Sequence, residues 1–279
     1  MLNIDTTTAH ASEYREQGYT VARGFFSKEQ ARELLTEVER LARLDAEAPA
    51  ALTDRGILYT GGIFMRSEST RKLLADQRVV DFLKPIAGPD LWITMDQAVT
   101  KHPGAGVFRW HQDNGYNKIK TEHFQLWIAL TPTRKKNGAL TLAPGSHKRG
   151  LLPHKFMGSG QMEVDAEIGD TISIDADEGD LIVFSSLMLH CTGPNEADST
   201  RVAYVAEYMP LHEYAPDMKP PYFVAAEAGK SNPHFIQVQP GSRSVKNQLM
   251  YLAPRVARTA KNALRPVRNA LIGKRPDAP

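Results

Sequence analysis

The apolar residues of this chain change their spacing near residue 91, from the period of an amphipathic helix to the period of a strand. Residues 27–44, SKEQARELLTEVERLARL, form one apolar stripe along a predicted helix that begins at Ser27, with Gln30 completing a capping box. A second helix is predicted over residues 69–83, ending before Pro85. Because the shorter period continues to about residue 209, the chain is predicted to be helical first and β-rich afterwards.

The β-rich part is built from short segments that alternate apolar and polar residues and are bounded by Gly, Pro, Asn or Asp. Strands are predicted at residues 91–100, 124–131, 138–143, 171–176, 180–186 and 201–209. In the first, Leu91, Ile93 and Met95 are expected on one face. In the second, Gln125 and Trp127 are expected on the face opposite Phe124 and its alternating apolar neighbours.

Helices followed by many short strands predict an α+β fold built on an antiparallel sandwich or barrel. One domain is expected from residue 10 to residue 250, followed by a basic tail, 251–279, that forms a helix or an extended end. Residues 53–67 and 211–233 carry no clear period and are expected to be mobile loops. The first residues lack a signal peptide and no window is apolar enough to span a membrane, so a cytoplasmic protein is expected.

His111 and Asp113, in the segment WHQDN, are the first candidate metal ligands. With the single cysteine, Cys191, the chain forms neither an internal disulfide nor a cysteine-rich zinc cluster, so a metal must be held by histidine and carboxylate. A spacing of two on a strand or at a strand end puts both side chains on one face, where His111 and Asp113 could share one metal. The pair by itself leaves two readings open, a shared metal or two unrelated polar residues.

His190 is the candidate third ligand, because it follows an apolar strand and enters a turn of small and polar residues. Arg201 lies eleven residues later, on a strand whose same-face neighbours are small and apolar. An arginine that points inward there is costly unless an anion meets it, and its planar fork suits a carboxylate. Two histidines and one aspartate leave coordination positions open, as in non-haem Fe(II) oxygenases.

Together these residues resemble the phytanoyl-CoA dioxygenase family of Fe(II)/2-oxoglutarate-dependent oxygenases. The resemblance covers most of residues 14–210 and combines several motifs, which makes it more specific than any one of them. It is carried by the segments YREQGYTVARGFFSKEQARELL, KHPGAGVFRWHQDNGY, FQLWIALTPTRKKNGALTLAPGSHKRG, DLIVFSSLMLHCTGPN and STRVAYVAEYMP. It implies a double-stranded β-helix core, of the jelly-roll and cupin type, with flanking N-terminal helices.

The family resemblance also assigns roles by position. His111, Asp113 and His190 match the iron ligands of the family. Arg201 matches the residue that binds the far carboxylate of 2-oxoglutarate, and Thr192 matches a hydroxyl that assists this arginine.

Other positions are assigned less directly by the resemblance. Gln97 and Trp127 fall where the family places groups that line the cosubstrate and the active site. Lys101 lies in the segment KHPG, which leads into the His-x-Asp motif, and a solvated lysine explains this residue equally well. Cys191 is expected to pack without binding metal. The sequence GSH at residues 145–147 and the pair Asn137-Gly138 are interpreted as turns, whereas His102, His123 and His154 are expected at the surface, with His154 or Asn114 as alternatives that face substrate.

The implied activity is an Fe(II)- and 2-oxoglutarate-dependent dioxygenase that uses O2 to hydroxylate a C–H bond of a small organic metabolite or natural product, releasing succinate and CO2. Two alternatives stay open: a non-redox cupin-like metal or ligand-binding protein, and a metal-dependent hydrolase or isomerase. The formal charge of +2 predicts no nucleic-acid partner. The run of seven basic and no acidic residues from Arg255 to Arg275 leaves a membrane-surface contact as a secondary hypothesis, and no pattern specifies an oligomeric state.

Overall fold

The computed structural model describes residues 4–46, 53–54, 56–116, 121–157, 161–210 and 222–236. The helices are α1 Ile4–Gln17, α2 Lys28–Ala46, α3 Ile63–Arg66, α4 Glu68–Leu74 and α5 Gln77–Ala87. The strands are β1 Tyr19–Ala22, β2 Thr53–Asp54, β3 Ile57–Gly61, β4 Leu91–Lys101, β5 Phe108–His111, β6 Phe124–Ala129, β7 Leu140–Leu142, β8 His154–Phe156, β9 Met162–Val164, β10 Ile172–Ile174, β11 Leu181–Ser185, β12 His190–Thr192, β13 Arg201–Pro210, β14 Tyr222–Glu227 and β15 Lys230–Ile236.

Two antiparallel sheets form the core of the fold. The described strands of the major sheet run in the order β1-β11-β6-β13-β4-β14-β15, with β3 also paired to β4 and β2 to β3. The minor sheet runs in the order β10-β7-β12-β5, and β8 and β9 form a separate hairpin. Because each sheet contains strands that are far apart in sequence, the chain crosses between the sheets as in a jelly roll. The predicted double-stranded β-helix is confirmed.

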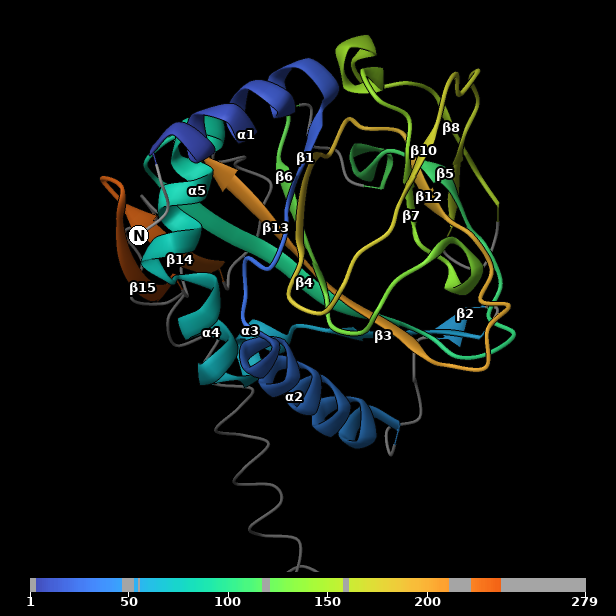
Figure 1. Cartoon of the computed structure of the whole chain (residues 1–279), viewed down its shortest axis with the longest axis horizontal. Coiled ribbons are helices and arrows are strands. Elements are labelled where there is room, and N and C mark those ends of the chain that lie inside the picture. The colour runs from blue at the N-terminus through green and yellow to red at the C-terminus, as the bar shows by residue number, and fades with distance from the viewer. Residues whose placement is uncertain are drawn as a thin grey trace, which may run out of the picture. The chain divides into compact units, whose positions relative to one another are not determined.

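The helices cover the face of the major sheet that points away from the minor sheet (Figure 1). Leu34 of α2 and Phe82 of α5 pack in one apolar core with Tyr204 and Tyr208 of β13. A second core, between the two sheets, includes Trp127 and the adjacent inner side chains of β7 and β11. The predicted faces of residues 124–129 are confirmed, since Phe124, Leu126 and Ile128 belong to the first core and Trp127 to the second.

The predicted helix at residues 27–44 is confirmed as α2, including its capping box. The Ser27 N–H donates to Gln30 Oε1 over 3.1 Å, and the Gln30 N–H donates to Ser27 Oγ over 3.2 Å. The helix predicted over residues 69–83 is instead divided into α4 and α5. Asp76 divides them because its side chain accepts a hydrogen bond from the Arg78 N–H and caps α5.

The prediction that this second helix ends before Pro85 is wrong. Pro85 lies inside α5, which continues to Ala87. A proline removes one hydrogen bond from the helix, but the burial of Leu83 and Ala87 against the sheet holds the last turn in place.

The two loop predictions are wrong for the residues that the structure describes. Residues 57–61 form β3, which pairs with β4, and residues 63–66 form α3. Residues 222–236 form β14 and β15, whereas residues 211–221 lie outside the described residues. In both segments, backbone pairing with β4 or with a neighbouring strand compensates for the irregular sequence pattern.

The predicted strand at residues 91–100 is confirmed as β4, but its faces are not continuous. The register between β13 and β4 shifts between Glu207 and Tyr208, beside Thr94. A β-bulge of this kind changes which side chains share a face. Ile93 therefore packs against the helices, whereas Met95 is 39% exposed at the rim of the inner face.

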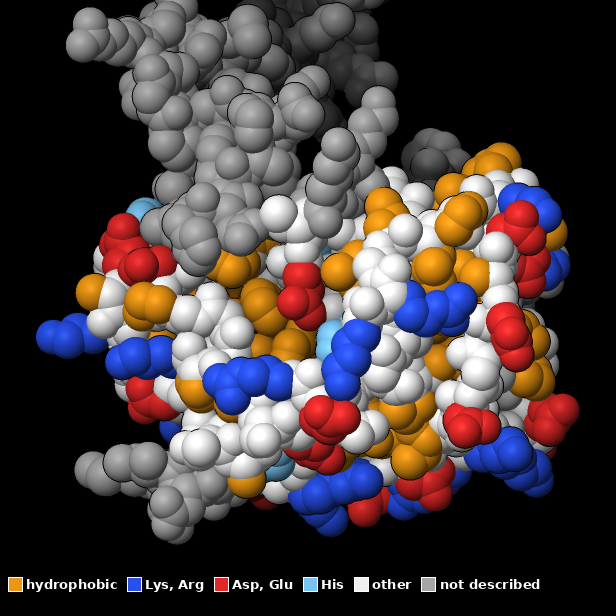
Figure 2. Space-filling model, turned by 90° about the horizontal axis from the view of Figure 1, so that it is seen from above, with side chains coloured by type: hydrophobic (Ala, Val, Ile, Leu, Met, Phe, Trp, Pro, Cys, Tyr) orange, Lys and Arg blue, Asp and Glu red, His pale blue; other side chains and the backbone are white. Residues whose placement is uncertain are grey.

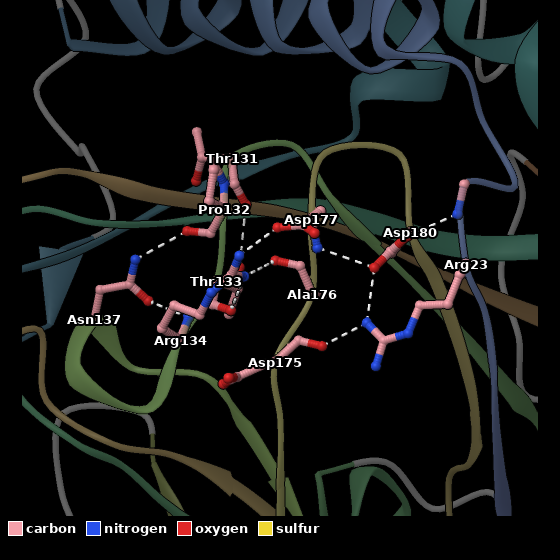
Figure 3. Close-up of polar contacts among 11 residues, drawn as sticks. Arg23, Thr131, Pro132, Thr133, Arg134, Asn137, Asp175, Ala176, Asp177 and Asp180 are labelled. Carbon is pink, nitrogen blue, oxygen red and sulfur yellow. Dashed lines mark hydrogen bonds and ion pairs between the residues drawn. The ribbon is translucent and has the colours of Figure 1, made fainter.

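A polar network ties the segment after β1 to the turn that precedes β11 (Figure 3). The Asp180 carboxylate accepts hydrogen bonds from Arg23 Nη1 at 2.7 Å, from the Gly24 N–H at 2.7 Å and from the Asp177 N–H at 2.9 Å. These bonds, with the charge of Arg23, hold the pKa of Asp180 below its usual value although burial alone raises it. The network therefore holds the segment after β1 against the turn between β10 and β11.

The surface in Figure 2 mixes acidic, basic and hydrophobic side chains without a continuous area of one charge. Among the described helices, none is long and apolar enough to cross a membrane. The basic tail, residues 251–279, lies outside the described residues, so its helix and its membrane contact stay predictions.

Candidate active site

His111, Asp113 and His190 come together at one end of the minor sheet. His111 ends β5, His190 begins β12, and the two are direct Cα partners. Asp113 lies in the short 3₁₀ turn that follows β5, where its Oδ1 is 3.6 Å from His111 Nε2 and 3.7 Å from His190 Nε2. The three ligand atoms all lie within 4.8 Å of one another, a spacing that one metal ion can bridge.

Both histidines have their outer ring nitrogen engaged by the backbone. His111 Nδ1 lies 2.7 Å from Arg109 O, and His190 Nδ1 lies 2.9 Å from Met188 O. Because a carbonyl oxygen accepts only, each Nδ1 carries the proton and each Nε2 presents a lone pair. Such bonds orient the ring of a metal-binding histidine.

The protonation states of the cluster also suit metal binding. Burial and the nearby His111 lower the pKa of His190 to about 4, so the ring is neutral at pH 7. Burial raises the pKa of Asp113, but its electrostatic interactions with the rings of His190 and His111 together hold it below the usual value. The cluster therefore offers the neutral imidazole of His190, the imidazole of His111 and one carboxylate.

Arg201 and Lys101 form a second charged group inside the barrel. Arg201 is fully buried; its Nη2 donates to Gly138 O over 2.8 Å. Lys101 is its Cα partner on β4, is also fully buried, and donates from Nζ to Thr192 Oγ1 over 3.0 Å and to Gly193 O. Burial and the charge of Arg201 lower the pKa of Lys101 to about 7, and burial lowers the pKa of Arg201 to about 10.

Neither cation contacts a carboxylate among the described residues, and Arg201 Nε is buried there without a hydrogen-bond partner. Two buried positive charges that lack an acidic neighbour are costly unless an anion binds between them. The reading of Lys101 as a solvated lysine is wrong, because the pairing of β4 with β13 places it inside the barrel.

The other assigned residues lie on the same inner surface. The Trp127 ring lies 5.9 Å from Arg201 Cζ. Gln97 is the Cα partner of Val205, which follows Arg201 by four residues on the same face of β13. The Thr192 hydroxyl contacts Lys101, and no hydrogen bond joins it to Arg201 within the described part of the chain. Thr192 therefore contacts the pair of cations at Lys101 and not at Arg201.

The remaining histidines and Cys191 lie in different environments. Burial raises the pKa of the Cys191 thiol to about 12, which keeps it protonated, as expected for a residue that packs without binding metal. His102 is exposed, as expected. His154 is half-buried and accepts a hydrogen bond from the Gln112 N–H at 3.0 Å. The surface reading of His123 is wrong, because His123 is 0% exposed and lies 3.7 Å from Glu207.

Sequence reasoning missed the polar group formed by His123, Glu207 and Gln125. For two of the three, the sequence pattern indicated an inward-facing side chain. Gln125 was predicted on the same face as Trp127, and Glu207 has the same strand parity as Arg201, so each is a polar residue on an inward face. His123 had no such signal, because its burial depends on long-range packing.

Comparison with known proteins places this architecture in a family. The family described as phytanoyl-CoA dioxygenase (PhyH) matches residues 14–203. A methylphosphonate hydroxylase of Gimesia maris is 25% identical, over 76% of this chain and 84% of its own length. A probable alpha-ketoglutarate-dependent hypophosphite dioxygenase of Stutzerimonas stutzeri is 24% identical, over 68% of this chain and 73% of its own length.

Among solved structures, the non-heme monooxygenase ThoJ superimposes with a TM-score of 0.69 and 22% identity, covering 93% of this chain and 99% of that one. This likeness shows the fold. The family match spans the segments that carry the His-Asp-His cluster and Arg201. The chain belongs to the phytanoyl-CoA dioxygenase family of Fe(II)- and 2-oxoglutarate-dependent oxygenases.

Proposed function

We propose that this chain hydroxylates a C–H bond of a small organic metabolite, with Fe(II) held by His111, Asp113 and His190 and with 2-oxoglutarate held by Arg201. The observation that carries the proposal is the combination of a buried His-Asp-His cluster with two buried cations that lack an acidic partner among the described residues. One group of residues is suited to a metal and the other to a dianion.

The donor set fits Fe(II). The cluster would hold the metal through two imidazole nitrogens and one carboxylate oxygen, and a set of two histidines and one carboxylate is typical of non-haem iron oxygenases. Asp113 Oδ2 is buried without a hydrogen-bond partner among the described residues, as expected for a carboxylate whose environment is completed by a cation.

The second group fits the cosubstrate. Arg201 presents a planar fork to the far carboxylate, and Lys101 adds a charge beside it. Trp127 flanks Arg201 and is itself buried. Bound Fe(II) and 2-oxoglutarate supply the oxidising chemistry, with O2 as oxidant and with succinate and CO2 as products. The chain's own residues orient the cosubstrate and exclude water.

Asp113 favours hydroxylation over halogenation, because the related halogenases lack the acidic ligand and leave its position to halide.

The two alternatives, a non-redox cupin and a metal-dependent hydrolase or isomerase, give no role to Arg201 and Lys101. The substrates in the names of the relatives, hypophosphite and methylphosphonate, are small molecules and support a small substrate for this chain as well.

The test begins without a substrate. Fe(II) and 2-oxoglutarate are added anaerobically to metal-free protein, and the weak visible absorption band of the iron chelate is measured. We expect the band in the wild type, its loss in His111→Ala and a weaker band at equal 2-oxoglutarate concentration in Arg201→Ala. His234→Ala, which removes an exposed histidine from β15, is the matched control and is expected to keep the band.

Succinate release in air then reports turnover. A wild type that binds a divalent metal but shows no band at any 2-oxoglutarate concentration would contradict the proposal and favour the non-redox or hydrolytic alternatives.

A further inference from the structure

The inner face of the major sheet carries two polar regions, one at each end of β13. Arg201, at the start of the strand, marks the end assigned to 2-oxoglutarate. Glu207 has the same parity and so faces the same side, six residues away, which is about 20 Å along an extended strand. The region around Glu207 takes no part in the site described so far.

Strand register places this second region beside the metal cluster. Glu207 is the Cα partner of Gln125 on β6, and Gln125 is the partner of Phe184 on β11. Directly paired residues share a face, so their side chains form one row across the inner surface. The Phe184 ring lies 4.8 Å from the His190 ring. The row therefore begins beside the metal cluster and crosses the sheet to β13, six residues along that strand from Arg201.

His123, the residue directly before β6, joins the row and is linked through Ser186 to the turn that carries Asp113. The His123 N–H donates to Ser186 Oγ over 2.9 Å, and the backbone of Ser186 also contacts the N–H of Asn114 at 3.4 Å. His123 Nε2 lies 3.7 Å from Glu207 Oε2. An acid, an imidazole and an amide thus converge next to the proposed metal.

The hydrogen-bonding capacity of this group is incomplete. Gln125 is 1% exposed, yet neither its Oε1 nor its Nε2 has a hydrogen-bond partner among the described residues. By hydrogen-bond geometry, both ring nitrogens of His123 also lack a partner there. A buried amide without partners is costly and is rare in folded proteins. Met95, the Cα partner of Glu207, is 39% exposed, so the row reaches the surface at that point.

We propose that Glu207, Gln125 and His123 form a substrate subsite that binds a hydrogen-bond-donating group, an amine or a hydroxyl, on a small polar metabolite. This inference rests on the proposed function and names the substrate class for the same site. Glu207 accepts from the donor, and the Gln125 amide pairs with neighbouring polar atoms of the same metabolite. An acyl chain would leave these groups unpaired, and an anion such as a phosphonate would meet the Glu207 carboxylate.

The test uses small probes on the anaerobic complex with Fe(II) and 2-oxoglutarate at pH 7.5. Ethanolamine and ethylene glycol carry the donor groups, whereas propionate and methylphosphonate are anions of similar size. We expect the donor probes to change the visible band in a saturable way and the anions to leave it unchanged. A response to ethanolamine alone identifies the amine, and a response to both probes identifies the hydroxyl.

Two variants and one control separate the subsite from the rest of the enzyme. Glu207→Gln is expected to weaken probe binding by about tenfold or more, because it removes a charged acceptor. Gln125→Met is expected to weaken probe binding and to raise the melting temperature, since it removes buried polar atoms that lack partners. Glu39→Gln, on the exposed face of α2, is the matched control and is expected to change neither quantity.

The outcomes distinguish the two proposals. If the wild type shows no band, the proposed function fails and the subsite fails with it. A normal band with no response to the donor probes, or with a response to the anions, overturns the subsite alone. A lower melting temperature in Gln125→Met also overturns it, because it would show that Gln125 has a structural role.

Discussion

Arg201 and Lys101 are direct partners across β13 and β4, and both cations are fully buried with no carboxylate nearby among the described residues. Adjacent like charges repel each other, and burial removes the water that would screen them. This explains why the pKa of Lys101 falls to about 7. The free protein thus carries an electrostatic cost that a bound dianion relieves.

The first prediction concerns the pH dependence of cosubstrate binding. Since the pKa of Lys101 in the free protein is about 7 and a dianion favours the charged amine, 2-oxoglutarate affinity should be constant below pH 7 and fall as pH rises above it. Lys101→Met should weaken binding at pH 6.5 by about tenfold or more and lose this pH dependence. Titration calorimetry with Mn(II) in place of Fe(II) measures both.

The control for this experiment is Lys135→Met, which removes an exposed lysine and should leave the affinity and its pH profile unchanged. An unchanged pH profile in Lys101→Met would show that another group sets the dependence.

The second prediction concerns Gly138, whose carbonyl accepts from Arg201. Gly138 has φ +85°, and an added Cβ would lie 2.7 Å from Gly193 O. Gly138→Ala should therefore lower the free energy of unfolding and weaken 2-oxoglutarate binding. Gly145→Ala is the matched control, because Gly145 also has a positive φ, +78°, but open space around the added atom. It should show only the backbone strain, about 1–2 kcal/mol, with unchanged binding. Equal effects of both variants on binding would contradict the prediction.

The third prediction concerns the metal. Because only the folded chain holds His111, Asp113 and His190 together, Mn(II) at a hundred times its dissociation constant should stabilise the protein by about 2.7 kcal/mol. A thermal-shift measurement should show this increase in the wild type and in His234→Ala. Asp113→Ala should lose it, and addition of a chelator should reverse it. A wild-type increase retained in Asp113→Ala would place the metal elsewhere.

The fourth prediction concerns Asp96, which anchors α3 to β4. Its buried carboxylate accepts from the N–H groups of Ile63 and Phe64 at 2.8 and 2.7 Å and from the Tyr204 hydroxyl at 2.5 Å. In Asp96→Asn, the amide NH2 must face one of these backbone donors. The free energy of unfolding at pH 7 should therefore fall by about 1–3 kcal/mol. Urea unfolding measures the difference, and Asp198→Asn at the surface is the control.

Asp96 also has a definite pH signature. Burial raises its pKa to about 6, although the hydrogen bonds from Tyr204, Phe64 and Ile63 oppose this. The folded protein thus binds the proton more tightly than the unfolded chain. The part of the stability that comes from proton binding at Asp96 should be fully present below about pH 4 and lost as pH rises through 6, whereas the hydrogen bonds to the carboxylate remain. Asp96→Asn should lack this change, and a wild-type profile that is flat over the same window would contradict the assignment.

Local sequence pattern was sufficient for the features that depend on neighbouring residues. The capping box of Ser27 and Gln30, the period of β6 and the His-x-Asp spacing of His111 and Asp113 all follow from contacts within a few residues. His190 and Arg201 were predicted from their places beside and on apolar strands, the family resemblance then assigned their roles, and the structure brings His190 to His111.

The tertiary structure decided what depends on strand register and on which face is covered. His190 meets His111 because β12 pairs with β5, far away in sequence. Lys101 is buried because β4 pairs with β13, and the bulge beside Thr94 changes the face of Ile93 relative to Met95. His123 is buried by its contact with Glu207. A period of two shows that residues share a face, but only long-range pairing determines whether that face meets water, a helix or the interior of the barrel.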